Sequence, residues 1–132
     1  MKGFDTNLLV RYLVRDDPQQ SAIVERLVAE VVDADEFVFL NHIVLCETFW
    51  VLESGYGYER EAVAEALEKL LLTQQFDFEG RDLVWSALRR FRAGKADLAD
   101  YLIGETNLSN GCERTLTFDR GLKEEKGFEL LG

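Results

Sequence analysis

Four acidic residues stand at places in the chain where a carboxylate is able to do chemistry. Asp5 and Asp119 each end a short segment that we predict as a strand, while Glu47 and Asp100 lie near the beginnings of two helical segments. If the four carboxylates converge, they repel one another unless a counter-charge is present. Oxygen-only ligands select a hard cation such as Mg²⁺ or Mn²⁺. Such an ion polarises a phosphoryl oxygen and activates water, so the set indicates metal-dependent cleavage of a phosphodiester.

Each of these acids also has a plainer interpretation. An aspartate directly after a strand is often a turn residue or a helix cap, and this applies to both Asp5 and Asp119. Asp97 is typical of an N-cap, and with Asp100 three residues later it resembles a capping box. Capping explains Asp100 less well, because a glutamate or glutamine reaches back to the cap better than the shorter aspartate does.

Glu47 lies in an almost wholly apolar helical run, Ile43 to Leu52. No lysine or arginine lies within one helical turn of it. If Glu47 is buried, its unpaired carboxylate raises its pKa or binds a cation. If it lies at a gap in the helix surface, it reaches water. The sequence leaves both interpretations open, and the same run favours a core position for Trp50.

Apolar spacing and turn residues predict the elements that must position these acids. The predicted strands cover residues 2–5, 37–40, 76–78, 115–118 and 128–131. The predicted helices cover residues 8–14, 18–34, 42–54, 59–73, 81–93 and 97–109, with Gly55 expected to end the third. Strands that alternate with helices predict an α/β fold, a small parallel sheet flanked by helices on both faces. We expect the four acids to share the edge where the strands end.

Composition bounds the class of protein. The chain has 132 residues, which fits a single domain over residues 1–132. The net charge of −10 argues against a protein that holds nucleic acid by a large basic surface, but it leaves room for a nuclease that brings metal cations to its own acids. Neither a signal peptide nor a membrane-spanning run is visible, so we expect a cytoplasmic protein with no membrane contact.

Three segments together resemble the PIN-domain family, most closely the VapC-type toxins of toxin–antitoxin pairs. The first is Asp5-Thr6-Asn7 with the apolar helix after it. The second is Glu47 with the Phe49-Trp50-Val51-Leu52 run. The third joins residues 97–103 to residues 115–119, and the resemblance covers nearly the whole chain, from residue 3 to about 123.

The resemblance implies a PIN-like fold and a Mg²⁺- or Mn²⁺-dependent endoribonuclease that cleaves RNA. It places the metal-binding acids of the family at Asp5, Glu47, Asp100 and Asp119. It assigns Asn7 and Thr117 to polar groups that orient a ligand or a water. Members of the family usually form homodimers and are held inactive by a cognate antitoxin protein.

Some features depart from the family's usual pattern. Asp97 is an additional acid, and three roles stay open for it: a fifth metal ligand, a group that supports the ligands, or only a helix cap. Glu105 stands where many relatives carry a small residue. The basic run of residues 89–95 precedes Asp97, so Arg92 is a candidate to hold substrate phosphates, although cations also favour a helix C-terminus.

Two alternatives to the nuclease stay open. A non-catalytic PIN-like module would bind RNA or a protein partner, but it would usually have lost one of the four acids. A phosphoryl-accepting receiver-like domain would want adjacent acids after its first strand and a lysine after a late strand. Here Asp5 is the only acid at the first position, and Asp119 stands at the second.

Overall fold

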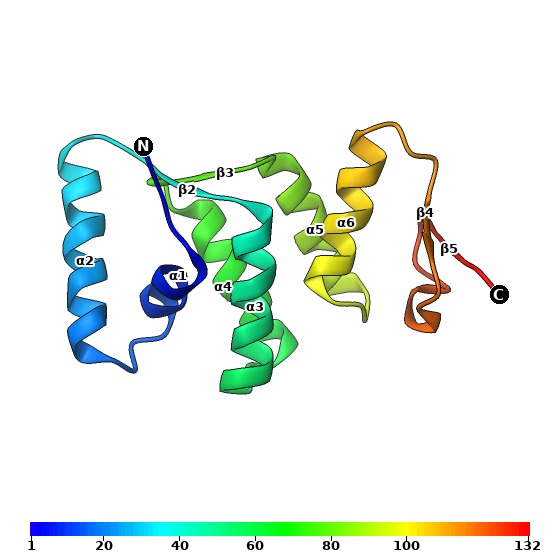
Figure 1. Ribbon diagram of the computed structural model, residues 1–132, viewed down its shortest axis with the longest axis horizontal. Helices are drawn as coiled ribbons and strands as arrows, with labels where there is room; N and C mark the ends of the chain where they lie inside the picture. The colour runs from blue at the N-terminus through cyan, green and yellow to red at the C-terminus, as the bar shows by residue number, and fades with distance from the viewer. The chain divides into compact units, whose positions relative to one another are not determined.

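The computed structural model describes all residues, Met1–Gly132, as two compact units, Met1–Arg81 and Asp82–Gly132 (Figure 1). The first unit contains a three-stranded parallel sheet in the order β1-β2-β3. Its strands are β1 (Lys2–Gly3), β2 (Val38–Leu40) and β3 (Phe76–Phe78). Its helices are α1 (Thr6–Leu13), α2 (Pro18–Asp33), α3 (His42–Tyr56) and α4 (Arg60–Leu72).

The core of the first unit lies between its sheet and its helices. Val38 and Leu40 of β2 are fully buried, and Leu45 of α3 is buried with them. Phe76 of β3 meets the Tyr12 ring edge-on, with ring centroids 5.1 Å apart. Helix α1 packs against both α2 and α3. The amphipathic helices thus cover the sheet with apolar side chains, as their spacing predicts.

Local signals set the helix ends in this unit. The Asp17 carboxylate accepts a hydrogen bond from the Gln20 N–H at 3.0 Å, and Pro18 opens α2 with the backbone angle that a first helical residue needs. The predicted end of α3 at Gly55 is wrong by two residues. The helix continues to Tyr56, and Gly57 is the residue with the left-handed φ of 69° that ends it.

The second unit contains α5 (Arg81–Ala93, which begins at the last residue of the first unit), α6 (Leu98–Ser109), β4 (Thr115–Thr117), the 3₁₀ turn η1 (Arg120–Leu122) and β5 (Phe128–Leu130). Strands β4 and β5 are parallel and pair only with each other. The fully buried Tyr101 donates its hydroxyl to the Glu125 carboxylate at 2.7 Å. Arg90 lies over the Tyr101 ring, 5.2 Å from its centroid.

The α/β class with small parallel sheets is confirmed. The prediction that all acids share one sheet edge is not met, because β4 and β5 form a sheet of their own. Strand pairing joins distant segments and leaves no local signal, so neither this division nor the turn η1 could be predicted from spacing. None of the helices combines the length and apolar character needed to cross a membrane.

Candidate active site

Asp5 connects the first strand to the first helix. It follows the buried Phe4 and adopts an extended backbone with φ −92° and ψ 178°. Its Oδ1 accepts a hydrogen bond from the Leu8 N–H at 3.2 Å, which makes Asp5 the N-cap of α1. The capping interpretation therefore holds, but the cap occupies only Oδ1. Asp5 is exposed, so its second carboxylate oxygen remains able to bind a cation.

Glu47 of α3 is linked to the residue next to Asp5. The Thr6 hydroxyl donates a hydrogen bond to Glu47 Oε1 at 3.1 Å, across 41 positions of sequence. Thr6 is the first residue of α1. The residue that follows Asp5 in the chain therefore contacts Glu47 directly and links the start of α1 to α3.

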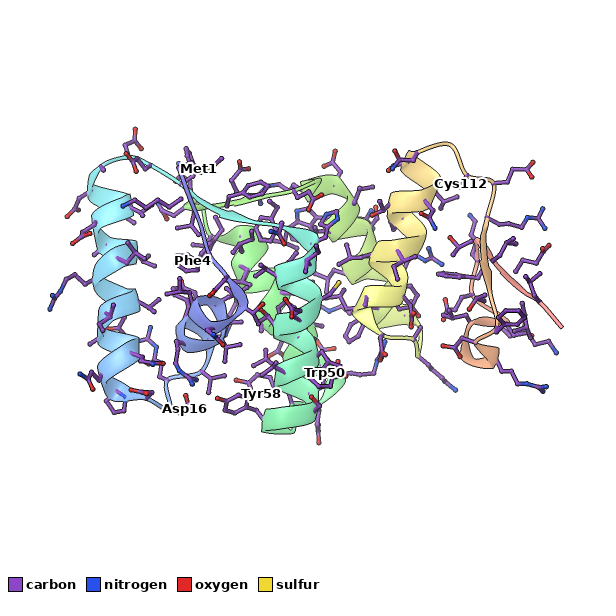
Figure 2. The ribbon with its side chains drawn as sticks, in the orientation of Figure 1. Met1, Phe4, Asp16, Trp50, Tyr58 and Cys112 are labelled. Atoms are coloured by element: carbon purple, nitrogen blue, oxygen red, sulfur yellow. The ribbon has the colours of Figure 1, made fainter.

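The surroundings of Glu47 decide between the two interpretations that the sequence left open. Glu47 is exposed, as are Ile43 at 71% and Trp50 at 70%, one turn to either side of it (Figure 2 labels Trp50 on α3). Its carboxylate therefore reaches water, and the expectation of a core position for Trp50 is wrong. Because α3 is apolar on almost every side, its spacing could not tell which face packs against the unit.

Asn7 lies beside a small cavity of the first unit. It is exposed and lines a hollow of about 230 Å³, between α1 and α2, together with Leu8, Arg11, Gln20, Ile23 and Val24. Its amide is thus accessible next to the Asp5 cap. That position suits a group that contacts a ligand.

Asp97 and Asp100 are joined at the start of α6. Asp97 is the N-cap residue, and its N–H donates to Asp100 Oδ2 at 3.3 Å. The Asp100 N–H in turn donates to the Asp97 carbonyl oxygen at 3.0 Å. An aspartate therefore does reach back to the cap, although at a long distance. Capping accounts for part of the role of Asp100, as it does for Asp5.

The electrostatics of Asp100 point beyond capping. Partial burial raises the pKa of its carboxyl, and the negative charges of Asp97 and Asp119 raise it further, whereas the hydrogen bond from the Asp97 backbone lowers it. The carboxylates of Asp97 and Asp119 therefore each lie close enough to repel that of Asp100. A bound cation would relieve this repulsion.

Asp119 is held in place by its neighbours. The Thr117 hydroxyl accepts a hydrogen bond from the Asp119 N–H at 3.0 Å. Asp119 Oδ1 accepts one from the Gly121 N–H at 2.8 Å, at the start of η1. A Cβ added to Gly121 would stand only 3.1 Å from that oxygen. Thr117 thus supports the Asp119 backbone, and its hydroxyl keeps a hydrogen that it can donate to a ligand or a water.

The basic run of residues 89–95 has two kinds of members. Arg90 is half-buried, pairs with Glu105 at 3.4 Å and also donates to the Lys126 carbonyl oxygen, so its role is structural. Glu105, the unusual acid of α6, is thereby neutralised. Arg89, Arg92 and Lys95 are exposed, which leaves them as the members of the run that could meet a phosphate.

Sequence reasoning missed the partner of the only histidine. The backbone N–H of His42 donates to Glu79 Oε1 at 2.9 Å, and the ring Nε2 of His42 lies 2.6 Å from the Glu79 carbonyl oxygen. This pair joins the start of α3 to the residue after β3. No local pattern indicates a contact across 37 positions.

The predicted acids thus fall into two groups, each within one unit. Asp5 and Glu47 belong to the first, and Asp97, Asp100 and Asp119 to the second. No three or more histidine, cysteine, aspartate or glutamate side chains already form a metal-binding cluster. All the donors are carboxylate oxygens, and the repulsion that Asp97 and Asp119 exert on Asp100 fits a hard divalent cation.

Comparison with known proteins supplies the family. The family model for the PIN domain matches residues 4–126. A VapC ribonuclease of Aquifex aeolicus (strain VF5) is 26% identical to the chain over 131 residues, which cover 99% of this chain and 96% of that protein.

Proposed function

The chain belongs to the PIN domain family, and we propose that it is a metal-dependent endoribonuclease, the toxin of a toxin–antitoxin pair. The match runs through both compact units, which supports one PIN-like domain over residues 1–132. The end-to-end similarity to a VapC ribonuclease supports RNA as the substrate.

One observation carries this proposal. Each of the four acids at the family positions has one carboxylate oxygen held by a specific donor. The donors are the Leu8 N–H for Asp5, the Thr6 hydroxyl for Glu47, the Asp97 N–H for Asp100 and the Gly121 N–H for Asp119. A carboxylate that is oriented by such a bond binds a cation with less loss of side-chain freedom than a mobile one does.

We propose that Mg²⁺ or Mn²⁺ is held by Asp5, Glu47, Asp100 and Asp119, with Asp97 as a fifth candidate ligand. When bound, the cation would polarise the phosphodiester and activate water for the attack. The task of the chain's own residues is to orient these acids through the hydrogen bonds named above. The cation would also stabilise the ionised form of Asp100 against the charges of Asp97 and Asp119.

Substrate binding has to overcome the net charge of −10. We propose that Arg92 meets substrate phosphates together with the other exposed cations of its run, and that the amide of Asn7 contacts the RNA next to Asp5. Thr117 acts by holding the backbone of Asp119. The family resemblance supports three further parts of this proposal. They are a homodimer, a cognate antitoxin that covers the site and a cytoplasmic location.

The test is cleavage of a mixed RNA pool by the purified chain with and without metal. We expect EDTA to abolish cleavage and Mg²⁺ or Mn²⁺ to restore it. Asp100→Asn should be inactive but folded, whereas Asp82→Asn, which changes an exposed acid of α5 outside the proposed set, should retain activity. Metal-independent cleavage would refute the mechanism. RNA binding without any cleavage would favour the non-catalytic module instead.

A further inference from the structure

Thr6 is connected to two of the proposed metal ligands: it is the neighbour of Asp5 in the sequence, and its side chain bonds Glu47. It follows Asp5 directly and is half-buried. Its hydroxyl donates to Glu47 Oε1 at 3.1 Å. It is the hydrogen bond that the structure shows for the Glu47 carboxylate, so it is the polar contact that orients this side chain.

The donor itself is held firmly. Thr6 begins α1 behind the Asp5 cap, and the Leu9 N–H donates to the Asp5 carbonyl oxygen at 3.2 Å in the first turn. Helix α1 packs against α3, which carries Glu47. A threonine in a helix is restricted to two main χ1 rotamers, so the Thr6 hydroxyl has few positions to sample. An exposed glutamate, by contrast, samples several rotamers unless a partner holds it.

We propose that Thr6 is a positioning residue whose hydroxyl holds Glu47 Oε1 and leaves Oε2 directed to the cation. This inference rests on the proposed function. It adds that the middle residue of the Asp5-Thr6-Asn7 segment acts on the metal through Glu47 and not by touching the metal or the RNA. The competing explanation is that the hydroxyl only joins α1 to α3.

The two explanations differ in what a change of Thr6 does to metal affinity. Thr6→Val removes the hydroxyl and keeps the branched shape, and Thr6→Ser keeps the hydroxyl. Thr73→Val is the matched control, because the Thr73 hydroxyl bonds only the Lys69 carbonyl oxygen at the end of α4 in the same unit. Calorimetric titration of each full-length protein with Mn²⁺, without RNA, measures affinity independently of turnover.

We expect Thr6→Val to weaken Mn²⁺ binding about tenfold, the lower end of the loss seen when a supporting partner of a metal ligand is removed. Thr6→Ser should stay within about twofold of the unchanged chain, and Thr73→Val should match it. In cleavage assays Thr6→Val should lower kcat with little change in KM for RNA. Thr6→Ala, which also lacks the hydroxyl, should behave like Thr6→Val if the latter folds poorly.

Other outcomes would overturn the inference. Equal Mn²⁺ affinity in Thr6→Val and the unchanged chain would show that the hydroxyl does not serve the metal. Equal losses in Thr6→Val and Thr6→Ser would assign the effect to packing, and failure of both hydroxyl-free variants to fold would assign it to folding. If the unchanged chain itself neither binds Mn²⁺ nor cleaves RNA, the proposed function fails first, and the inference fails with it.

Discussion

Asp97 acts on Asp100 in two opposing ways: its backbone N–H donates to the Asp100 carboxylate at 3.3 Å, while its own negative charge raises the pKa of Asp100. The first contact stabilises the ionised form and the second destabilises it. A helix cap and a charged site therefore share the same two residues.

Asp97→Asn separates these two effects. An asparagine is still a good N-cap and keeps the backbone N–H that Asp100 accepts, but it carries no charge. We expect the pKa of Asp100 to fall toward its ordinary value, with a change in stability within about 0.5 kcal/mol. Carboxyl-carbon NMR of Asp100 across a pH titration measures this directly. An unchanged pKa would show that the Asp97 charge does not act on Asp100.

Asp100→Asn should make the metal-free protein slightly more stable at neutral pH. Because the folded-state pKa of Asp100 is raised above 3.8, the folded protein binds its proton more tightly than the unfolded chain does. Its contribution to stability is therefore greatest below 3.8 and decreases as the pH rises through the raised pKa. The asparagine should raise Tm at pH 7 on the order of 1 °C, and the difference should vanish in acid. A lower Tm at pH 7 would contradict the account.

Arg90 and Arg92 should have separate phenotypes although they are two residues apart. Arg90→Ala removes a half-buried ion pair with Glu105 and the cation that lies over Tyr101. It should cost about 2 kcal/mol of unfolding free energy in urea. Arg92→Ala should instead weaken RNA binding with little loss of stability, and it should reduce the slope of log affinity against log salt by about one. The reverse pattern would exclude Arg92 from substrate binding.

The two glycines at the end of α3 should respond oppositely to alanine. Gly55 lies within the helix, and an added Cβ meets only the Val51 side chain at 3.8 Å, so Gly55→Ala should stabilise the fold by about 0.5 kcal/mol or more. Gly57 has a φ of 69°, and Gly57→Ala should destabilise it by about 1 kcal/mol. Denaturant unfolding of both variants checks the assignment. Similar effects at the two positions would contradict the observed helix end.

The sequence predicted those features that depend on near neighbours. The N-caps of α2 and α3 are Asp17 and Asn41, which accept hydrogen bonds from the Gln20 and Val44 N–H groups, and such contacts within one turn can be predicted from residue type. The exposure of Glu47, the His42–Glu79 contact and the separate β4–β5 sheet depend on distant segments, and local patterns carry no signal for them. The acids can be recognised from the sequence because their residue types and their order along the chain match the family pattern. A donor such as the Thr6 hydroxyl is brought to its acid by the fold, so the sequence does not reveal it.

The most direct test of the account is the binding of Mn²⁺ to the metal-free full-length chain and to single variants of one acid from each unit, Asp5→Asn and Asp119→Asn. The account predicts that the unchanged chain binds Mn²⁺ and that each variant loses at least about tenfold in affinity, because the proposal assigns both acids to one cation. If either variant, still folded, binds Mn²⁺ as tightly as the unchanged chain, the shared metal site is contradicted.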